Sequence, residues 1–230
     1  MAFRSAFRLA PLRSIRHYSK NEANEIGKEE TKAINDEESK VWESFSKCGD
    51  DGTSKTITGE VLPKNHSIFN AIGATEELLS YLGLAREYAY ENEHDYTDKL
   101  KRIQTIVIDI STAISRTTGK NGVKQMPKIY TQELEDWIQE YSKELAPLEQ
   151  YIIPGGGMPS ASLHIARSVC RKTERKVIPF VQEGSLDGET LRYLNRLSDF
   201  LLTVSRIAAK RDQRTESIYI PTPDETVQPQ

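Results

Sequence analysis

The sequence predicts an all-α protein, a five-helix bundle in an up-down, ferritin-like arrangement. Apolar residues recur with helical period in five segments between residues 63 and 210. Short breaks separate these segments, as expected for helices that pack against one another. No period of 20 to 50 residues repeats along the chain, which excludes a solenoid.

The first two helices are predicted from their apolar stripes. The first begins after Pro63, since proline is favoured at the start of a helix, and the second begins at about Tyr96. The stretch from Gly119 to Pro127 ends the second helix. The expected inward side chains are Ile68, Phe69, Ile72, Leu79 and Leu82 in the first helix, and Leu100, Ile103, Ile106 or Val107, Ile110 and Ile114 in the second.

The third helix is expected to open at Thr131, which suits an N-cap, and to close before Pro147. An apolar run from Ile152 then ends in a glycine turn, and the fourth helix starts at about Pro159. The fifth starts near Asp187. The expected inward side chains are Leu134, Trp137, Ile138, Tyr141 and Leu145, then Ile165, Val169 and Val177, then Leu191, Leu194, Leu197, Leu201, Val204 and Ala208.

Composition excludes several classes of protein. Of 230 residues, 37% are hydrophobic and 28% charged, which is too apolar for a disordered chain. No run of 18 apolar residues occurs, so no membrane insertion is expected. The net charge of −3 does not favour nucleic acid as a partner. Cys48 and Cys170 lie far apart, which argues against a disulfide framework or a zinc site.

Residues 1–20 form a basic amphipathic segment. They contain four arginines and one lysine among apolar side chains, and no acidic residue. This pattern is typical of a mitochondrial transit peptide, which predicts a location in the mitochondrial matrix; a basic arm that binds a surface is the alternative. We expect residues 21–44 to be an acidic flexible linker, 45–220 the helical-bundle domain, and 221–230 a loose proline-rich tail.

The most informative segment lies between Arg167 and Lys176, where six of ten residues are charged. Arg167, Arg171 and Glu174 share one face of a helix, and Arg175 follows Arg171 at four residues. Guanidinium groups bind phosphate through a planar fork, so this stripe could receive a polyanion. A solvated basic face explains the same pattern.

Two further polar segments accompany the basic helix. Residues 47–55 combine glycines, hydroxyls and lysines, which can surround an oxyanion, although an ordinary polar turn explains them equally. Their spacing is not that of a P-loop. Residues 195–199 place polar groups beside the inward stripe of the fifth helix, as part of a site or of a structural network between helices.

Four segments, at 47–52, 151–156, 167–176 and 195–201, resemble corrinoid adenosyltransferases in residues and in order. The similarity is to the propanediol-utilisation (PduO) type of ATP:cob(I)alamin adenosyltransferase, mitochondrial members included, and covers about residues 45 to 220. It implies a homotrimer with active sites between subunits. The implied reaction moves the 5′-deoxyadenosyl group of ATP to cobalamin, with Mg²⁺ as counter-ion. A cobalamin reductase and an acceptor mutase are implied as partners.

The resemblance also implies roles for individual residues. Arg171, Glu174 and Arg175 would be catalytic, and Tyr151 would contact cobalamin and help to displace its lower axial ligand. Arg167 would pair across the subunit interface with Glu76, which we expect near the apolar stripe of its helix. No metal ligand is assigned. The implied ATP-binding residues are Ser46, Lys47, Cys48, Gly49, Asp50, Asp51, Gly52, Thr53, Ser54, Lys55, Lys64, Arg171, Lys172, Thr173, Glu174, Arg175 and Asn195.

Three positions depart from the family's pattern. Asp51 stands where many relatives have a lysine, Glu76 is one methylene longer than the usual aspartate, and Tyr151 replaces a phenylalanine. The departures leave a second reading open, a non-catalytic scaffold or cobalamin-carrying adaptor in mitochondria. The sequence shows no nucleophile–base arrangement, and the implied reaction needs none because cobalt(I) is itself the nucleophile.

Overall fold

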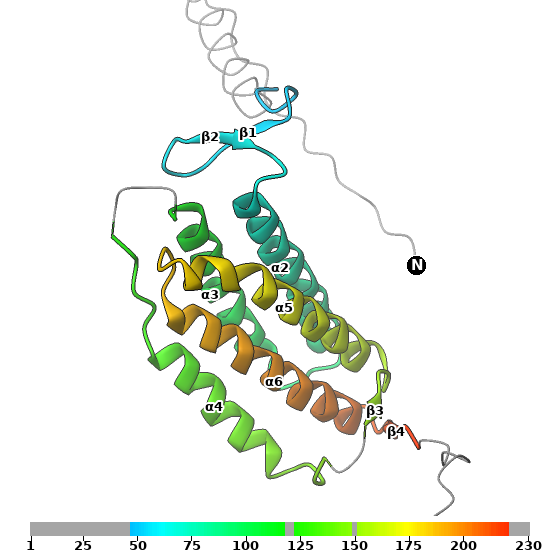
Figure 1. Ribbon diagram of the computed structural model, residues 1–230. Coiled ribbons are helices and arrows are strands. Elements are labelled where there is room, and N and C mark those ends of the chain that lie inside the picture. Colours follow the sequence, from blue (N-terminus) through cyan, green and yellow to red (C-terminus); the bar gives the residue numbers. More distant parts are fainter. Residues whose placement is uncertain (1–46, 118–121, 149–150, 221–230) are drawn as a thin grey trace, which may run out of the picture. The chain divides into compact units, whose positions relative to one another are not determined.

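The structure, a computed structural model, describes residues 47–117, 122–148 and 151–220. The chain divides after Asp50 into two units, and the second carries all the elements below. Its helices, labelled as in Figure 1, are α2 (Ser67–Glu91), α3 (Thr97–Ser115), α4 (Ile129–Ser142), α5 (Met158–Gln182) and α6 (Gly188–Arg211). Its strands are β1 (Thr53–Lys55), β2 (Val61–Pro63), β3 (Ile152–Ile153) and β4 (Ser217–Ile218).

The all-α bundle is confirmed. The helix α5 packs against both α2 and α6, while α3 packs against α2 and α4 against α6. Short connections join α2 to α3 and α5 to α6, so each of these pairs runs antiparallel (Figure 1). Among the described helices, none is long and apolar enough to cross a membrane.

The predicted core residues of α3 are correct, and so are those of α6 except Leu191, which is only half-buried. All the apolar side chains expected inward in the second helix are buried, Ile106 and Val107 alike. In α6 the start at Asp187 is confirmed, because the Asp187 side chain accepts a hydrogen bond from the Glu189 amide and so caps the helix. Lys210 and Arg211 lie in the last turn, where positive charge complements the helix dipole.

Three details of the predicted helices are wrong. Pro63, expected at the start of the first helix, lies in β2, and α2 begins at Ser67. The helix α4 begins at Ile129 rather than Thr131, and the Thr131 hydroxyl donates to Glu189 Oε1 at 2.7 Å instead of capping. Ile165 was expected to point inward but is 44% exposed. The buried stripe of α5 runs through Leu163, Ala166 and Val169, and Ile165 lies on the other side of the helix.

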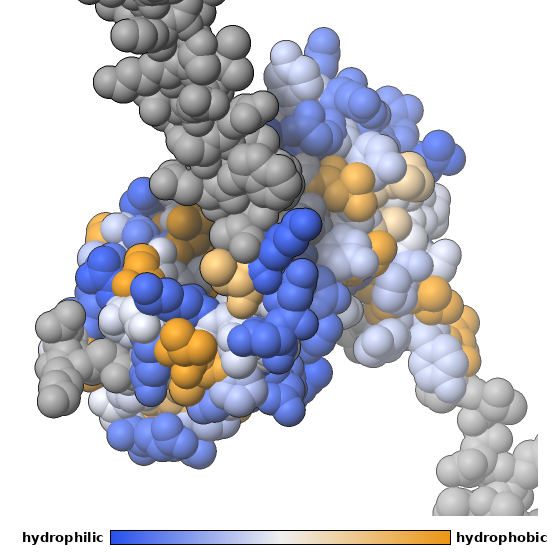
Figure 2. Space-filling view, turned by 90° about the horizontal axis from the view of Figure 1, so that it is seen from above, coloured by the Kyte–Doolittle hydropathy of each residue, from blue (hydrophilic) through white to orange (hydrophobic). Residues whose placement is uncertain are grey.

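Two small antiparallel ribbons were not predicted. The strand β1 pairs with β2, with Ser54 opposite Leu62, inside the stretch expected to be a loop. The strand β3 pairs with β4, with Ile152 opposite Ile218. Figure 2 views the molecule from above and shows a mainly hydrophilic surface with small hydrophobic patches between hydrophilic residues.

Candidate active site

A groove of about 520 Å³ lies where the β1–β2 ribbon meets α2 and α3. It contains two cations, Lys55 and Lys64, and one carboxylate, that of Glu76. The amide of Ile57 donates to Ser115 Oγ at 3.0 Å, which ties the ribbon to the end of α3. The remaining lining residues are Ser54, Ile57, Phe69, Ile72, Gly73, Ser111, Thr112 and Ser115. The groove is therefore rich in hydroxyls and positive charge, which suits a phosphate group.

Asp51 organises the turn that leads into β1. Its Oδ1 accepts from the Thr53 hydroxyl at 2.7 Å and from the Thr53 amide at 2.8 Å. These hydrogen bonds hold the pKa of the Asp51 carboxyl below its ordinary value, and the bond from the Thr53 hydroxyl has the largest effect. Gly52 has a φ of +81°, a conformation that glycine adopts without strain. Asp51 thus stabilises the turn itself.

The rest of the predicted loop belongs to the first unit of the chain. Lys47 to Asp50 form a turn in which the Asp50 amide donates to the Lys47 carbonyl at 3.0 Å. Ser46 lies outside the described residues. The predicted nucleotide contacts of Ser46, Lys47, Cys48, Gly49 and Asp50 stay predictions.

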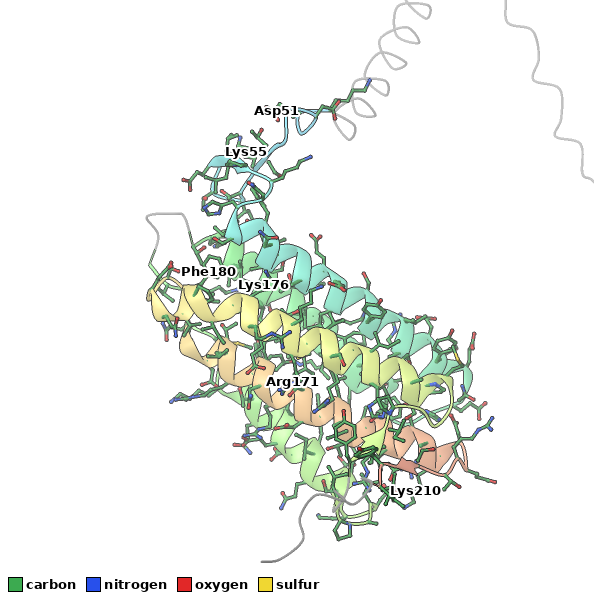
Figure 3. All side chains as sticks on the ribbon, turned by 45° about the vertical axis from the view of Figure 1, so that its right-hand side comes forward. Asp51, Lys55, Arg171, Lys176, Phe180 and Lys210 are labelled. Atoms are coloured by element: carbon green, nitrogen blue, oxygen red, sulfur yellow. The ribbon has the colours of Figure 1, made fainter. Side chains whose placement is uncertain are left out.

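Arg171 and Arg175 are exposed on one face of α5. Within the part of the chain that the structure describes, neither guanidinium forms a hydrogen bond or an ion pair. Figure 3 shows Arg171 on the middle turns of α5, far along the helix from Phe180. Two unpaired guanidinium groups one turn apart repel each other, and an anion bound between them would relieve that repulsion.

The side chains of Lys172 and Thr173, which were also predicted to bind ATP, form bonds within the bundle instead. The ammonium group of Lys172 pairs with Glu77 Oε2 of α2 at 2.5 Å. Thr173 is fully buried, and its hydroxyl donates to the Ala74 carbonyl at 2.9 Å. Both side chains therefore connect α5 to α2, whereas Arg171 and Arg175 point to the surface.

Glu174 and Asn195, both predicted to bind ATP, lie in contact with each other. Asn195 Nδ2 donates to Glu174 Oε1 at 3.0 Å, which links α6 to α5. The alternative prediction, that residues 195–199 form a structural network between helices, is also confirmed in part. Arg196 bonds to Glu135 Oε1 at 3.1 Å and to Asp199 Oδ2 at 2.8 Å. The segment thus fixes the packing of α6 against α4 and α5 and leaves the exposed Asn195 beside Glu174, which lies between Arg171 and Arg175 on α5.

Arg167 has an unusual environment. Its Nε is buried and has no hydrogen-bond partner among the described residues. Next to it on α5, His164 is 8% exposed, and its pKa is lowered by burial and by the positive charge of Arg167. A buried guanidinium nitrogen without an acceptor is costly, so Arg167 is a candidate for a partner beyond this chain.

The expectation that Glu76 lies near the apolar stripe of α2 is wrong. Glu76 is exposed and lines the groove with Lys55 and Lys64. The buried stripe passes instead through Ala74, Thr75 and Leu78, and Glu76 lies on the exposed side of the helix. Within the described residues of one chain, Glu76 does not pair with Arg167.

Tyr151 is 71% exposed and precedes the β3–β4 ribbon. Its carbonyl accepts from the Tyr219 amide at 2.8 Å, so the ribbon's pairing extends to this residue. The glycine turn that follows packs closely on α6, since a Cβ at Gly156 would lie 2.8 Å from Ala209 Cβ. Four apolar side chains of the ribbon and its ends are exposed. By the register, Tyr151, Ile153 and Tyr219 share one face, and Ile218 lies with Ile152 on the other.

The two groups of cations do not meet in one chain. The groove is lined by the ribbon, α2 and α3, and neither Arg171 nor Arg175 contributes to it. Figure 3 likewise shows Lys55 on the ribbon beyond the start of α2, away from Arg171. Lys55 and Lys64 therefore do not line a common cavity with Arg171 and Arg175 within one chain.

Sequence reasoning missed the hydroxyls of α3. Ser111, Thr112 and Ser115 line the groove, and their clustering at the end of the second predicted helix was the available signal. No group of three or more His, Cys, Asp or Glu side chains that could hold a metal ion occurs among residues 47–117, 122–148 and 151–220.

Comparison with known proteins gives a consistent result. The family model described as cobalamin adenosyltransferase matches residues 44–208. Corrinoid adenosyltransferase MMAB from Mus musculus is 40% identical over 187 residues, 78% of each chain, and that from Homo sapiens is 40% identical over 183 residues, 76% of this chain and 72% of the relative. Corrinoid adenosyltransferase from Citrobacter freundii is 31% identical over 169 residues, 73% of this chain and 95% of the relative.

Solved structures agree with these relatives. A variant PduO-type ATP:corrinoid adenosyltransferase from Lactobacillus reuteri, complexed with cobalamin and ATP, superposes with a TM-score of 0.71 at 26% identity. The match covers 75% of this chain and 97% of the other. A second variant, complexed with ATP, has a TM-score of 0.68 at 26% identity and covers 76% and 98% of the two chains.

Proposed function

The chain belongs to the cobalamin adenosyltransferase family, and we propose that it transfers the 5′-deoxyadenosyl group of ATP to cob(I)alamin. The electron pair of cobalt(I) forms the new bond to C5′ of the ribose. The C5′–oxygen bond breaks, and its electron pair leaves with the triphosphate. The protein must therefore align cobalt with C5′ and stabilise the charge of the leaving group.

The observation that carries the proposal is the pair of exposed guanidinium groups of Arg171 and Arg175 on α5, which have no hydrogen-bond or ion-pair partner among the described residues. We assign them to the triphosphate, where charged hydrogen bonds contribute about 1.5–3 kcal/mol each. Lys55 and Lys64 would hold the same triphosphate from the groove of a neighbouring subunit. This division explains why one chain does not bring the two pairs together, and it supports a homotrimer with its sites between subunits.

Glu174 and Asn195 would bind the nucleoside part of ATP. Their mutual hydrogen bond fixes the Glu174 carboxylate beside the arginine stripe, where it could accept a hydrogen bond from a ribose hydroxyl. The side chains of Lys172 and Thr173 are left out of this assignment because they bond to α2.

Cobalamin would lie against the apolar surface of the β3–β4 ribbon. Tyr151 presents an exposed ring there, and an apolar contact favours a cobalamin whose lower ligand has left the cobalt. That form is more readily reduced to cobalt(I), so the ribbon would assist the reaction before ATP is attacked. A cobalamin reductase would supply the reduced substrate and a mutase would accept the product.

Magnesium would arrive with ATP rather than occupy a site built by the protein. The described residues offer no cluster of carboxylates for it, and Mg²⁺ commonly binds through substrate phosphates and water. Its charge would add to that of the arginines and lysines around the triphosphate.

One assay tests the proposed reaction. Purified full-length protein, given ATP and chemically reduced cobalamin without oxygen, should form adenosylcobalamin and triphosphate in equal amounts. Absorption spectra report the first product, and phosphate analysis after a triphosphatase reports the second. If ATP raised the melting temperature of the protein but no adenosylcobalamin were formed, the result would instead favour a scaffold or cobalamin-carrying adaptor.

We further propose that residues 1–20 direct the protein into mitochondria, as their basic amphipathic pattern predicts. Removal of these residues should leave a fluorescent fusion protein in the cytosol, while the purified truncated enzyme keeps its adenosylation activity. The matched control is replacement of Glu22, Glu25, Glu29 and Glu30 in the acidic linker by glutamine, which should not affect import. Import of the truncated fusion would contradict the assignment.

A further inference from the structure

The ribbon that carries Tyr151 depends on a distant part of the chain. The strand β3 has only two residues, too few for an independently stable element. Its partner β4 comes from the segment after α6, and the Tyr219 amide extends the pairing to the Tyr151 carbonyl at 2.8 Å. Figure 1 shows β3 and β4 side by side beside the end of α6, at the opposite end of the bundle from β1 and β2.

The nearly buried guanidinium of Arg206 bonds to the segments that precede β3 and β4. Arg206 of α6 is 9% exposed, and its Nε donates to Glu216 Oε1 at 2.9 Å while its Nη2 donates to Glu216 Oε2 at 3.2 Å. The same Nη2 donates to the Ala146 carbonyl at 3.0 Å. Glu216 directly precedes β4, and Ala146 belongs to the segment that leads from α4 toward β3.

The chemistry of arginine suits this arrangement. Its planar fork can hold a carboxylate through two parallel hydrogen bonds and still donate to a carbonyl, whereas an ammonium group acts as a point charge. Because the guanidinium is nearly buried, these hydrogen bonds are little weakened by water. The two segments that flank the ribbon are thereby fixed to the rigid helix α6.

We propose that Arg206 and Glu216 are positioning residues for cobalamin, an inference that rests on the proposed function of the Tyr151 ribbon. They hold the strand β4, which in turn holds the Tyr151 backbone in place. Loosening the pair should therefore weaken cobalamin binding and leave ATP binding unaffected.

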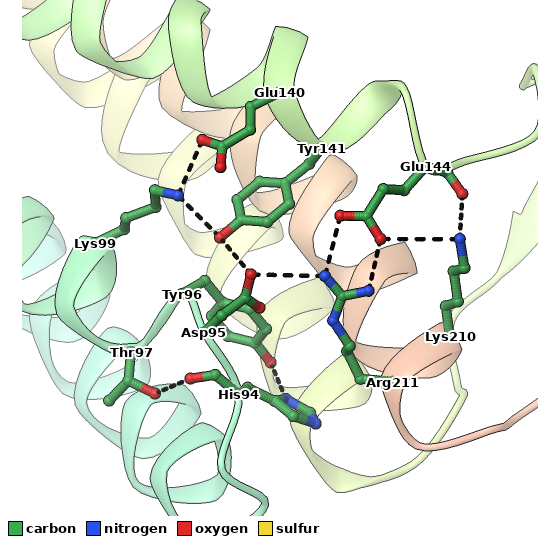
Figure 4. Close-up of polar contacts among 10 residues, drawn as sticks. All are labelled: His94, Asp95, Tyr96, Thr97, Lys99, Glu140, Tyr141, Glu144, Lys210 and Arg211. Carbon is green, nitrogen blue, oxygen red and sulfur yellow. Dashed lines mark hydrogen bonds and ion pairs between the residues drawn. The ribbon is translucent and has the colours of Figure 1, made fainter.

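The helix α6 offers a matched control. Arg211 forms a similar two-pronged pair with Glu144, with Nη1–Oε2 at 2.6 Å and Nη2–Oε1 at 3.0 Å (Figure 4). Arg211 also approaches Asp95 Oδ2 at 3.5 Å. This pair joins α6 to the end of α4 and to the α2–α3 connection, and neither side chain bonds to a residue of β3 or β4.

The test compares Glu216→Gln with Glu144→Gln in the full-length protein. The Glu216→Gln variant should raise the KM for cobalamin about fivefold to tenfold, as expected for one weakened charged hydrogen bond, with the KM for ATP within about twofold of wild type. The spectrum of bound cob(II)alamin should show a smaller share without the lower ligand. The Glu144→Gln variant should leave all three quantities unchanged. Equal changes in both variants, or equal changes in both KM values, would overturn the proposal.

A second pair of variants keeps the test decisive if Glu216→Gln folds poorly. Tyr219→Pro and Tyr219→Ala both remove the ring, but only the proline removes the amide that bonds to Tyr151. The proline variant should bind cobalamin about fivefold more weakly than the alanine variant in a fluorescence titration; equal affinities would refute the role of the ribbon. Because this readout needs no turnover, it stays separate from the proposed function, which fails only if the wild-type protein forms no adenosylcobalamin.

Discussion

Replacing Arg171 with alanine should lower kcat/KM for adenosylation by about tenfold to a hundredfold, which corresponds to the loss of about 1.5–3 kcal/mol from a charged hydrogen bond to the leaving triphosphate. The Arg171 side chain is exposed and has no partner among the described residues of its own chain. The substitution should therefore leave the melting temperature nearly unchanged. Arg171→Lys should recover part of the activity, because lysine keeps the charge but not the planar fork.

Lys176 provides the control for this substitution. It is also an exposed cation of α5, but it lies well around the helix axis from Arg171 (Figure 3). Lys176→Ala should keep wild-type kinetics. If Arg171→Ala matched Lys176→Ala in steady-state assays with ATP and reduced cobalamin, the arginine stripe would have no part in the reaction.

Replacing Arg167 with glutamate should dissociate the proposed homotrimer and abolish most of the activity. The Arg167 Nε is buried without an acceptor in the described part of the chain, and Glu76 is exposed on α2 without an ion-pair partner there. We expect these two groups to pair between subunits, where breaking a buried ion pair costs about 3–5 kcal/mol. Sedimentation velocity would report the change in assembly.

The reciprocal exchange distinguishes this pair from a general loss of folding. The double variant Arg167→Glu, Glu76→Arg should regain the trimer and part of the activity. Lys172→Ala serves as the control, because Lys172 pairs with Glu77 of its own chain at a half-exposed site, where an ion pair contributes little. A trimer that survives Arg167→Glu, or a double variant no better than the single ones, would count against the interface.

The sequence predicted the helices well because their apolar stripes are continuous. Periodicity reports which face of a helix is buried, and it located the core of α3 residue by residue. In α6 it found five of six predicted positions, but Leu191 is half-buried and the buried Tyr193 and Phe200 were not predicted. Periodicity was less reliable in predicting whether one particular residue lies on the buried face of its helix. Ile165 is apolar yet exposed, since Leu163 and Ala166 already occupy the inward stripe, and Glu76 lies outside the stripe of α2.

Pairings between distant segments could not be predicted from periodicity. The ribbon joins Ile152 to Ile218, and the guanidinium of Arg206 joins Glu216 to Ala146. Such contacts depend on how the helices pack, and two-residue strands carry no pattern of their own. The family resemblance drew attention to residues 167–176, which contain the exposed Arg171 and Arg175, whereas the groove is lined by residues outside 47–52.

The central claim is that cations of two neighbouring subunits converge on the triphosphate of ATP. A crystal structure of the assembled protein with ATP tests it most directly. We expect phosphate oxygens within about 3 Å of Arg171 or Arg175 of one subunit and of Lys55 or Lys64 of its neighbour. Phosphates bound away from both arginines, or held entirely by a single chain, would contradict the account.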